Sequence, residues 1–308
     1  MSMLNMKENV PLAPLTTFEI GGIARYFADV RTEGDIREAR AWVKEKRVPL
    51  IVWAGGSNVL VPDEGLEALV IRIVNETSSF SGTTLEADAG CNLLALIRAA
   101  AERGLGGWEK LAGIPGTIGG AVRGNAGAFG PEVKDFVVVV RAMHVDSGEV
   151  RDFDNAECDF SYRHSFFKEH PEWVILRAFF RLLPTKSEES IRTVEETISE
   201  REERHIQNVK AAGSFFVNPV APKEIQEMFE KEKGMKAREG RVPAGWLIEK
   251  VGLKGARVGG AEASVQHPNY LKNAGNATAK DVLVLAQKIK DAVREQFGIE
   301  LKEEAVVL

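Results

Sequence analysis

The sequence contains only two cysteines, Cys91 and Cys158, among its 308 residues. Two thiols are too few for a disulfide framework or for a zinc site built on cysteine. Their scarcity favours a protein of a reducing compartment, so we expect a cytoplasmic location. The five histidines, at positions 144, 164, 170, 205 and 267, lack the spacing of a metal-binding motif, and no metal site is expected.

Long apolar runs and an excess of positive charge are also missing. No segment approaches the roughly 18 apolar residues that cross a membrane, and the first residues lack a basic stretch followed by an apolar one. Lys and Arg number 40 against 45 Asp and Glu, which gives a formal net charge of -5. This balance provides no overall basic field, so we expect neither nucleic acid nor a membrane among the partners.

The composition that is present belongs to a folded protein of about two domains. Hydrophobic residues make up 44% and charged residues 28% of the chain, which lies inside the globular range. In the first half, short apolar runs alternate with glycine-rich connections and predict strands. The runs are 50–53, 69–73, 84–87, 136–140 and 173–181, and 137–145 with 149–153 predicts a hairpin.

Three segments predict helices. Asn92 is suited to cap the first, whose apolar face ends near Gly104. After a polar break over 184–189, the charged segment 190–208 predicts a second helix with a solvated face, and we place the main domain boundary at this break. Near the end, Thr278 and Asp281 have capping-box spacing before an apolar-periodic stretch that Gly298 closes. The fold class predicted from these elements is α+β.

Glycine is concentrated in two segments, 54–60 and 113–121. Because glycine adopts positive φ readily and carries no side chain, such loops let backbone N–H groups approach an anion such as a phosphate. A tight turn is the alternative for either loop alone, but two loops in one domain favour the phosphate interpretation. Neither loop matches a P-loop or a dinucleotide-binding fingerprint, which disfavours a P-loop NTPase and a Rossmann enzyme.

At these loops the sequence resembles the bacterial UDP-N-acetylenolpyruvoylglucosamine reductase family. The resemblance continues in chain order through further motifs over nearly the whole chain. The chain lacks the longer insertions of one subgroup and is similar to the compact branch of the family. The segments that carry it are 15–22, 55–60, 113–121, 125–130, 157–165, 212–219, 244–253, 259–264 and 298–304.

The resemblance implies an FAD-binding domain of the vanillyl-alcohol-oxidase (PCMH) type in two subdomains, 1–75 and 76–185, and a C-terminal α+β substrate-binding domain over 186–308 whose last residues return to the active site. It implies a cytoplasmic flavoenzyme of peptidoglycan precursor synthesis with noncovalent FAD and with NADPH as co-substrate. NADPH gives hydride to flavin N5, and the reduced flavin passes hydride to UDP-N-acetylglucosamine enolpyruvate, forming UDP-N-acetylmuramate.

The resemblance also implies a catalytic set of Arg163, Ser214 and Glu304. Hydride addition pushes negative charge into the substrate carboxylate, which a guanidinium can hold with two parallel hydrogen bonds. Glu304 is expected to act beside Arg163 as a protonated donor, with Glu303 as the alternative in register, and Ser214 is expected to supply the proton. Without the resemblance, these residues would be interpreted as a surface ion pair, a turn residue and a solvated acidic tail.

Further residues are carried over as binding contacts. Tyr162 and Asn218 are expected to contact the substrate. Two positions depart from the family pattern, Arg123 beside the second glycine loop and Val217, where a basic residue is common. The expected FAD contacts are Gly55, Gly56, Ser57, Asn58, Ile114, Gly116, Thr117 and Gly119.

Two alternatives remain open. One is an FAD-dependent oxidase of the same fold that acts on an alcohol or lactone, and the other is a non-catalytic nucleotide-binding module. Neither has a use for the combination of Arg163, Ser214 and Glu304, which is why the reductase is preferred.

Overall fold

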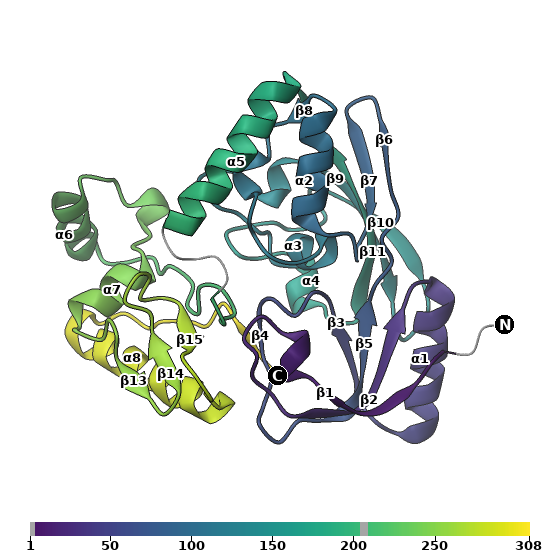
Figure 1. Ribbon diagram of the computed structural model, residues 1–308, viewed down its shortest axis with the longest axis horizontal. Coiled ribbons are helices and arrows are strands. Elements are labelled where there is room, and N and C mark those ends of the chain that lie inside the picture. Colours follow the sequence, from purple (N-terminus) through teal and green to yellow (C-terminus); the bar gives the residue numbers. More distant parts are fainter. Residues whose placement is uncertain (1–3, 204–208) are drawn as a thin grey trace. The chain divides into compact units, whose positions relative to one another are not determined.

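The computed structural model describes residues 4–203 and 209–308, and Figure 1 shows its helices and strands. Contacts between residues divide the chain into two compact units. Unit 1 contains the described residues 4–10, 24–56 and 66–203, and unit 2 contains 11–23, 57–65 and 209–308. Each unit is therefore discontinuous in sequence.

The first sheet of unit 1 has four strands in the order β1-β2-β5-β3. Its strands are β1 (Lys7–Pro11), β2 (Ile23–Val30), β5 (Leu66–Ile73) and β3 (Leu50–Trp53). Both β2 and β3 run parallel to the central β5. The crossover helix α1 (Glu33–Lys46) begins with a capping box made by Thr32 and Asp35, and buries Ile36 and Val43.

The second sheet has five strands in the order β10-β9-β11-β7-β6 and is antiparallel throughout. Its strands are β6 (Ser78–Ser81), β7 (Thr84–Asp88), β9 (Val137–His144), β10 (Val150–Asp154) and β11 (Trp173–Arg181). The predicted hairpin is confirmed as β9 and β10, and β11 has the predicted bounds. A short pair, β8 (Leu105–Gly106) with β12 (Leu183–Pro184), completes the strands of this unit.

The helices of unit 1 include the two predicted ones. As expected, Asn92 caps α2 (Leu93–Glu102) by accepting a hydrogen bond from the Ala95 N–H. The predicted break over 184–189 is partly wrong, because α5 (Ser187–Glu203) already begins at Ser187 with acidic residues in its first turn, where the helix dipole favours them. The rest of the predicted helix, 204–208, lies outside the described residues. The short helices are α3 (Ile118–Arg123), α4 (Phe166–Glu169), η2 (Glu109–Leu111) and η3 (Val133–Asp135).

Contacts with the body of unit 1 explain why α5 belongs to it. The Ser190 hydroxyl donates a 2.6 Å hydrogen bond to the buried Glu109 carboxylate. On the solvent side, Arg98 of α2 forms an ion pair with Glu195 at 3.1 Å. Unit 1 therefore extends to Glu203, beyond residue 185, where the sequence placed the end of the FAD-binding part.

Unit 2 is built around one small antiparallel sheet and three helices. The sheet has the order β13-β14-β15, and a separate parallel pair joins β4 to β16. The strands are β4 (Val59–Leu60), β13 (Arg257–Val258), β14 (Ala261–Ala263), β15 (Leu271–Asn273) and β16 (Val306–Val307). The helices are α6 (Lys223–Lys233), α7 (Ala244–Lys250) and α8 (Ala279–Phe297), with the short turns η1 (Ala13–Leu15) and η4 (Arg238–Gly240).

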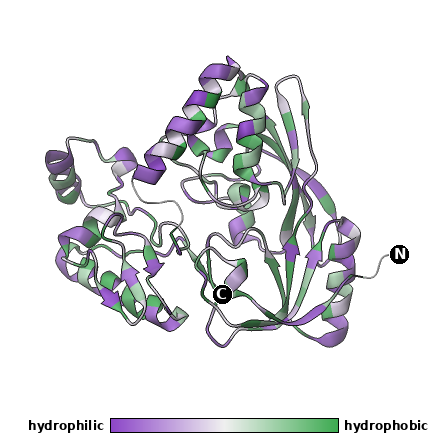
Figure 2. Cartoon of the chain, in the orientation of Figure 1, coloured by the Kyte–Doolittle hydropathy of each residue, from purple (hydrophilic) through white to green (hydrophobic). Residues whose placement is uncertain are grey.

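Each unit has its own hydrophobic core. Side chains from both sheets, α1, α2 and α5 share the core of unit 1, and those of α7, α8 and the small sheet dominate the core of unit 2. Figure 2 shows hydrophobic residues along the central strands and hydrophilic residues along the outer faces of α5 and α6. In the described part of the chain, no helix combines the length and apolarity that a membrane crossing needs.

Helix α8 has the predicted caps at both ends. The Thr278 hydroxyl accepts from the Asp281 N–H at 3.0 Å, while the Asp281 carboxylate accepts from the Thr278 N–H at 3.1 Å. Gly298 ends the helix in the left-handed conformation at φ 64°. The helix buries Val282, Leu285 and Ile289 in the core of unit 2, so its caps bear on the stability of that unit.

Replacing Thr278 with alanine is expected to destabilise unit 2 by about 1 kcal/mol, because the Asp281 N–H loses its acceptor at the helix start. Urea unfolding followed by circular dichroism measures this loss. The matched variant Thr278→Ser keeps the hydroxyl and should retain most of the stability. Equal unfolding midpoints for wild type and Thr278→Ala would show that the cap has no such role.

Candidate active site

The two glycine-rich loops meet in unit 1. A Cβ atom added at Gly55 would lie 3.2 Å from the Gly116 Cα and 3.5 Å from the Thr117 methyl carbon. Gly116 itself has φ +123°, a conformation that L-residues rarely adopt. Segments some 60 residues apart in sequence are therefore in close backbone contact, with a tight fit at Gly55 and a backbone conformation that favours glycine at Gly116.

Two buried polar atoms of this region have no hydrogen-bond partner among the described residues. They are the Trp53 indole Nε1, at the end of β3 just before the first loop, and the Thr117 hydroxyl in the second loop. Buried polar groups are nearly always paired. Each of these two groups could therefore form a hydrogen bond with a bound molecule.

The remaining residues of the first loop belong to unit 2. Asn58 donates from Nδ2 to the Glu304 carbonyl oxygen at 3.2 Å, and its own carbonyl oxygen accepts from the Val306 N–H at 3.0 Å. The parallel pairing of β4 with β16 continues this contact. The C-terminal segment is thereby held against Asn58, the second residue after the glycine pair.

Arg163 lies in unit 1 in a two-residue turn between Ser161 and His164, whose backbones exchange hydrogen bonds of 3.2 and 3.0 Å. Its φ of 58° is uncommon for a residue other than glycine and marks local backbone strain, which is often found at functional sites. Its Nη2 donates to the Gly127 carbonyl oxygen at 2.8 Å, and its guanidinium lies 5.0 Å from the centre of the Tyr162 ring. These contacts fix the direction of the side chain.

The loop that receives Arg163 is organised by a fully buried asparagine. Asn125 donates from Nδ2 to the Glu132 carboxylate at 3.0 Å and to the Ser161 carbonyl oxygen at 2.8 Å, and its Oδ1 accepts from the Lys134 N–H at 3.0 Å. One side chain thus joins the loop carrying Gly127 to the turn that presents Arg163. Asn125 was not predicted as a site residue, although it opens the quoted segment 125–130.

Ser214 and Glu304 lie close together in unit 2. The Glu304 N–H donates to the Phe215 carbonyl oxygen at 2.8 Å, and Phe216 forms a β-bridge with Glu303. The Ser214 side chain is partly exposed. The backbone of the residue that follows Ser214 is therefore bonded to the backbone of the predicted acid.

The structure also separates the two candidate glutamates. Glu303 forms an ion pair with Lys290 of α8, with a 3.0 Å distance between Oε1 and Nζ. Its carboxylate is therefore already engaged by a cation. Glu304 contacts the segment of Ser214 through its backbone.

A buried asparagine that sequence reasoning missed holds the serine segment. Asn269 is 2% exposed and makes three hydrogen bonds to it. Its backbone carbonyl accepts from the Phe215 N–H at 2.7 Å, its Oδ1 accepts from the Phe216 N–H at 3.0 Å, and its Nδ2 donates to the Phe216 carbonyl at 2.8 Å. No motif in the sequence marks Asn269 for this role.

Other predicted positions have structural contacts. The Asn218 Oδ1 accepts from the Ala244 N–H at 2.9 Å, at the first residue of α7. The Val217 N–H donates to the Lys302 carbonyl at 2.9 Å. Arg123, which departs from the family pattern beside the second glycine loop, has a pKa lowered by burial. The predicted site residues in unit 1 are Gly55, Gly56, Ile114, Gly116, Thr117, Gly119, Tyr162 and Arg163, and those in unit 2 are Ser57, Asn58, Ser214, Asn218 and Glu304.

The two thiols are unsuited to catalysis. Burial raises the pKa of Cys91 to about 11 and that of Cys158 to about 12, so both remain protonated near neutral pH, and both cysteines are free and buried. Within 4–203 and 209–308, no group of three or more His, Cys, Asp or Glu residues could hold a metal ion.

Comparison with known families matches both parts of the chain. A family model described as an FAD binding domain matches residues 24–154. A second, described as the C-terminal domain of UDP-N-acetylenolpyruvoylglucosamine reductase, matches residues 204–308. Together with the paired glycine loops, these matches define an FAD-dependent oxidoreductase with the predicted α+β fold, in which an FAD-binding domain is followed by a reductase C-terminal domain.

Individual relatives are similar over almost their whole length. The reductases of Solibacter usitatus and Pseudomonas aeruginosa are 40% and 36% identical, over 98% of this chain and 96% and 98% of their own. The crystal structure of UDP-N-acetylenolpyruvylglucosamine reductase from Thermus caldophilus superposes with a TM-score of 0.78 at 33% identity, covering 98% of this chain and 99% of that chain. The chain belongs to the UDP-N-acetylenolpyruvoylglucosamine reductase family.

The residues of this chain fit FAD. The backbones of the two glycine loops meet at Gly55 and Gly116 with no side chain between them, and glycine-rich loops of this kind can bind a pyrophosphate through backbone N–H groups. The Thr117 hydroxyl in the second loop is buried and has no partner in the described chain.

Gly116→Ala is expected to reduce the FAD content of the purified protein, because an alanine at φ +123° is strained and shifts the loop. The ratio of absorbance at the flavin band to that at 280 nm after gel filtration measures this loss. The matched control is Gly120→Ala, where a Cβ would meet only ordinary contacts, at 3.7 Å from Ala54. Equal flavin content in both variants would contradict the role of Gly116.

Proposed function

We propose that this enzyme reduces UDP-N-acetylglucosamine enolpyruvate to UDP-N-acetylmuramate with NADPH as the electron donor, in the cytoplasm. Family membership supports the reaction class. The observation that supports the residue-level proposal is the backbone hydrogen bond from Glu304 to Phe215, the residue that follows Ser214. The two free, buried thiols are consistent with a reducing compartment.

We propose that residues of both glycine loops hold FAD. Gly55, Gly56, Ser57 and Asn58 would surround the pyrophosphate, and Ile114, Gly116, Thr117 and Gly119 would line the second side through their backbone and the Thr117 hydroxyl. When bound, FAD supplies the hydride acceptor and donor that joins oxidation of NADPH to reduction of the substrate vinyl group. The four-stranded and five-stranded sheets support a division of the FAD-binding part into subdomains near residue 75, and unit 2 would provide the substrate-binding part.

The charge that develops in the substrate determines what the side chains must do. Addition of hydride to the vinyl carbon places negative charge on the adjacent carbon and its carboxylate. In the proposed arrangement, the Arg163 guanidinium binds that carboxylate, and Glu304 acts as a hydrogen-bond donor to it. Tyr162 and Asn218 are proposed to contact the substrate. The strained turn and the bond to Gly127 support a fixed direction for the Arg163 side chain.

The same reaction needs a proton at the carbon bearing the charge. Ser214 is the proposed donor, since a hydroxyl can protonate a strongly basic carbon when it is accurately placed. The three hydrogen bonds between Asn269 and the residues that follow Ser214 support such placement. An oxidase that uses oxygen needs no such donor, and the match of 204–308 to the reductase C-terminal domain further disfavours that alternative.

Ser214→Ala should leave reduction of the flavin by NADPH unchanged and slow its reoxidation by UDP-N-acetylglucosamine enolpyruvate by about 10²- to 10⁴-fold, the usual contribution of a proton donor. Anaerobic stopped-flow absorbance at the flavin band measures the two half-reactions separately. Ser214→Cys, which keeps an acidic hydrogen, should retain more of the second rate. An equal loss in both half-reactions would reject Ser214 as the donor.

The two glutamates can be separated in the same assay. Glu304→Ala should slow the reoxidation step by about 10²-fold, as loss of one donor to a developing anion does, whereas Glu303→Ala should change it little. Glu303→Ala also removes the ion pair with Lys290, so it controls for general loosening of the tail. The reverse order of effects would transfer the role to Glu303.

A further inference from the structure

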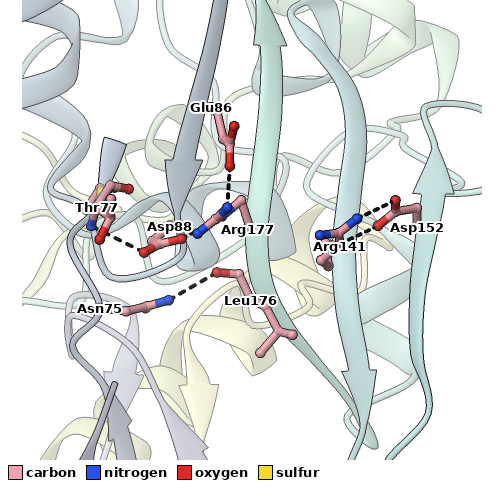
Figure 3. A network of polar contacts seen from close by, with 9 residues as sticks. Asn75, Thr77, Glu86, Asp88, Arg141, Asp152, Leu176 and Arg177 are labelled. Atoms are coloured by element: carbon pink, nitrogen blue, oxygen red, sulfur yellow. Dashed lines mark hydrogen bonds and ion pairs between the residues drawn. The ribbon is translucent and has the colours of Figure 1, made fainter. Parts of the chain in front are cut away.

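A polar network joins the two sheets of unit 1 at the chain crossover between them. Strand β5 ends at Ile73 and β6 begins at Ser78, so residues 74–77 carry the chain from one sheet to the other. Figure 3 shows side chains of Asn75, Asp88 and Arg177 converging at this crossover. None of them was among the predicted site residues.

Asp88, the last residue of β7, is at the centre of the network and is 5% exposed. Its Oδ1 accepts from Arg177 Nε at 2.7 Å, and its Oδ2 accepts from the Thr77 N–H at 3.2 Å. Arg177 also pairs with Glu86 on β7. A buried carboxylate with both oxygens bonded in this way fixes the end of β7 to β11 and to the crossover.

Asn75 fixes the residues that follow Asp88. Its Nδ2 donates to the Leu176 carbonyl at 3.3 Å, and its Oδ1 accepts from the Gly90 N–H at 3.2 Å. A Cβ atom at Gly90 would lie 2.4 Å from the Asn75 carbonyl oxygen, so the two backbones are too close for any side chain there. The Ala89 N–H also donates to the Leu176 carbonyl, at 2.9 Å.

The segment held in this way, 88–92, lies against the second glycine loop. The Ile118 N–H donates to the Cys91 carbonyl at 2.9 Å, and the Gly119 N–H donates to the Ala89 carbonyl at 2.8 Å. In the opposite direction, the Leu93 N–H donates to the Gly116 carbonyl at 3.2 Å. A Cβ at Gly119 would lie 3.0 Å from the Ala89 Cβ, so a shift of 88–92 must also shift 116–119.

We propose that Asn75, Asp88 and Arg177 are positioning residues for FAD. They hold segment 88–92 to the crossover and to β11, and that segment sets the backbone of the loop 116–119. The inference rests on the proposed placement of FAD at this loop and is independent of the substrate and of the proton donor.

A neighbouring ion pair in the same sheet provides a matched control. Arg141 of β9 binds Asp152 of β10 through two hydrogen bonds, of 2.7 and 2.8 Å. Arg141 is the cross-strand partner of Arg177, yet its partner acid is on the strand away from β7, as Figure 3 shows. Asp152→Asn therefore removes a more exposed charge pair from the same sheet without changing segment 88–92.

The test measures the dissociation constant of FAD for the apo-protein by fluorescence titration, together with visible circular dichroism of the bound flavin and the thermal midpoint of the apo-protein. Asp88→Asn and Asn75→Ala are expected to weaken FAD binding roughly tenfold or more and to alter the visible spectrum. Asp152→Asn should stay within about twofold of wild type. Asn75→Asp, which keeps the acceptor for Gly90, provides a milder variant if Asn75→Ala fails to fold.

A purely structural role would lower the thermal midpoint of Asp88→Asn and Asn75→Ala while leaving the FAD affinity and the visible spectrum unchanged, and this result would overturn the proposal. An equal loss of affinity in Asp152→Asn would also overturn it. Gly116→Ala, titrated in parallel, separates two kinds of failure. If Gly116→Ala alone loses affinity, the loop binds FAD but the network does not position it, and if it binds FAD normally, the placement of FAD at this loop is wrong.

Discussion

The close approach of two backbone segments in unit 1, at Gly55 and Gly116, is the constraint on which the proposed cofactor site depends. A side chain on either residue would separate the loops or strain one of them. The surroundings of this contact are also defined by backbone groups, since the loop 116–119 is bonded to segment 88–92 through main-chain atoms.

The groups proposed for chemistry are presented in a different way. Arg163 depends on a strained turn and on a carbonyl acceptor in a loop that Asn125 organises. The segments of Ser214 and Glu304 are joined by a β-type backbone contact, and Asn269 forms further hydrogen bonds to the serine segment. In each case a buried asparagine uses its donor and acceptor groups to join two irregular segments, which regular secondary structure could not do there.

Much of this architecture could be predicted from the sequence. Strand β11, the β9–β10 hairpin and the caps of α2 and α8 follow local rules, because apolar periodicity and capping residues act over a few positions. The start of α5 was misplaced because Ser187, Glu188 and Glu189 have the composition of a polar loop and are also suited to a first helical turn. The glycine loops were identified from the density of glycine in the sequence, whereas the catalytic candidates were identified from the resemblance.

What could not be predicted depends on contacts between distant residues. Asn269 and Asp88 are polar residues with no local motif, and only the fold shows that they are buried and what they bind. The ion pair between Lys290 of α8 and Glu303 is another contact of this kind. The spacing of apolar residues predicts a helix or a strand, but it does not predict which distant residue a single polar side chain will contact.

The pairing of β4 with β16 joins Val59 to Val306, so a strand near the start of the chain has its partner almost at the end. During synthesis, residues 11–23 and 57–65 leave the ribosome long before the rest of unit 2 exists, and domains generally fold from the N-terminus as they emerge. These early segments cannot make their contacts with residues 209–308 until those residues have been synthesised. Folding of unit 2 is therefore a late event with large loop-closure entropy, and the nascent chain is exposed to aggregation and chaperone binding during that interval.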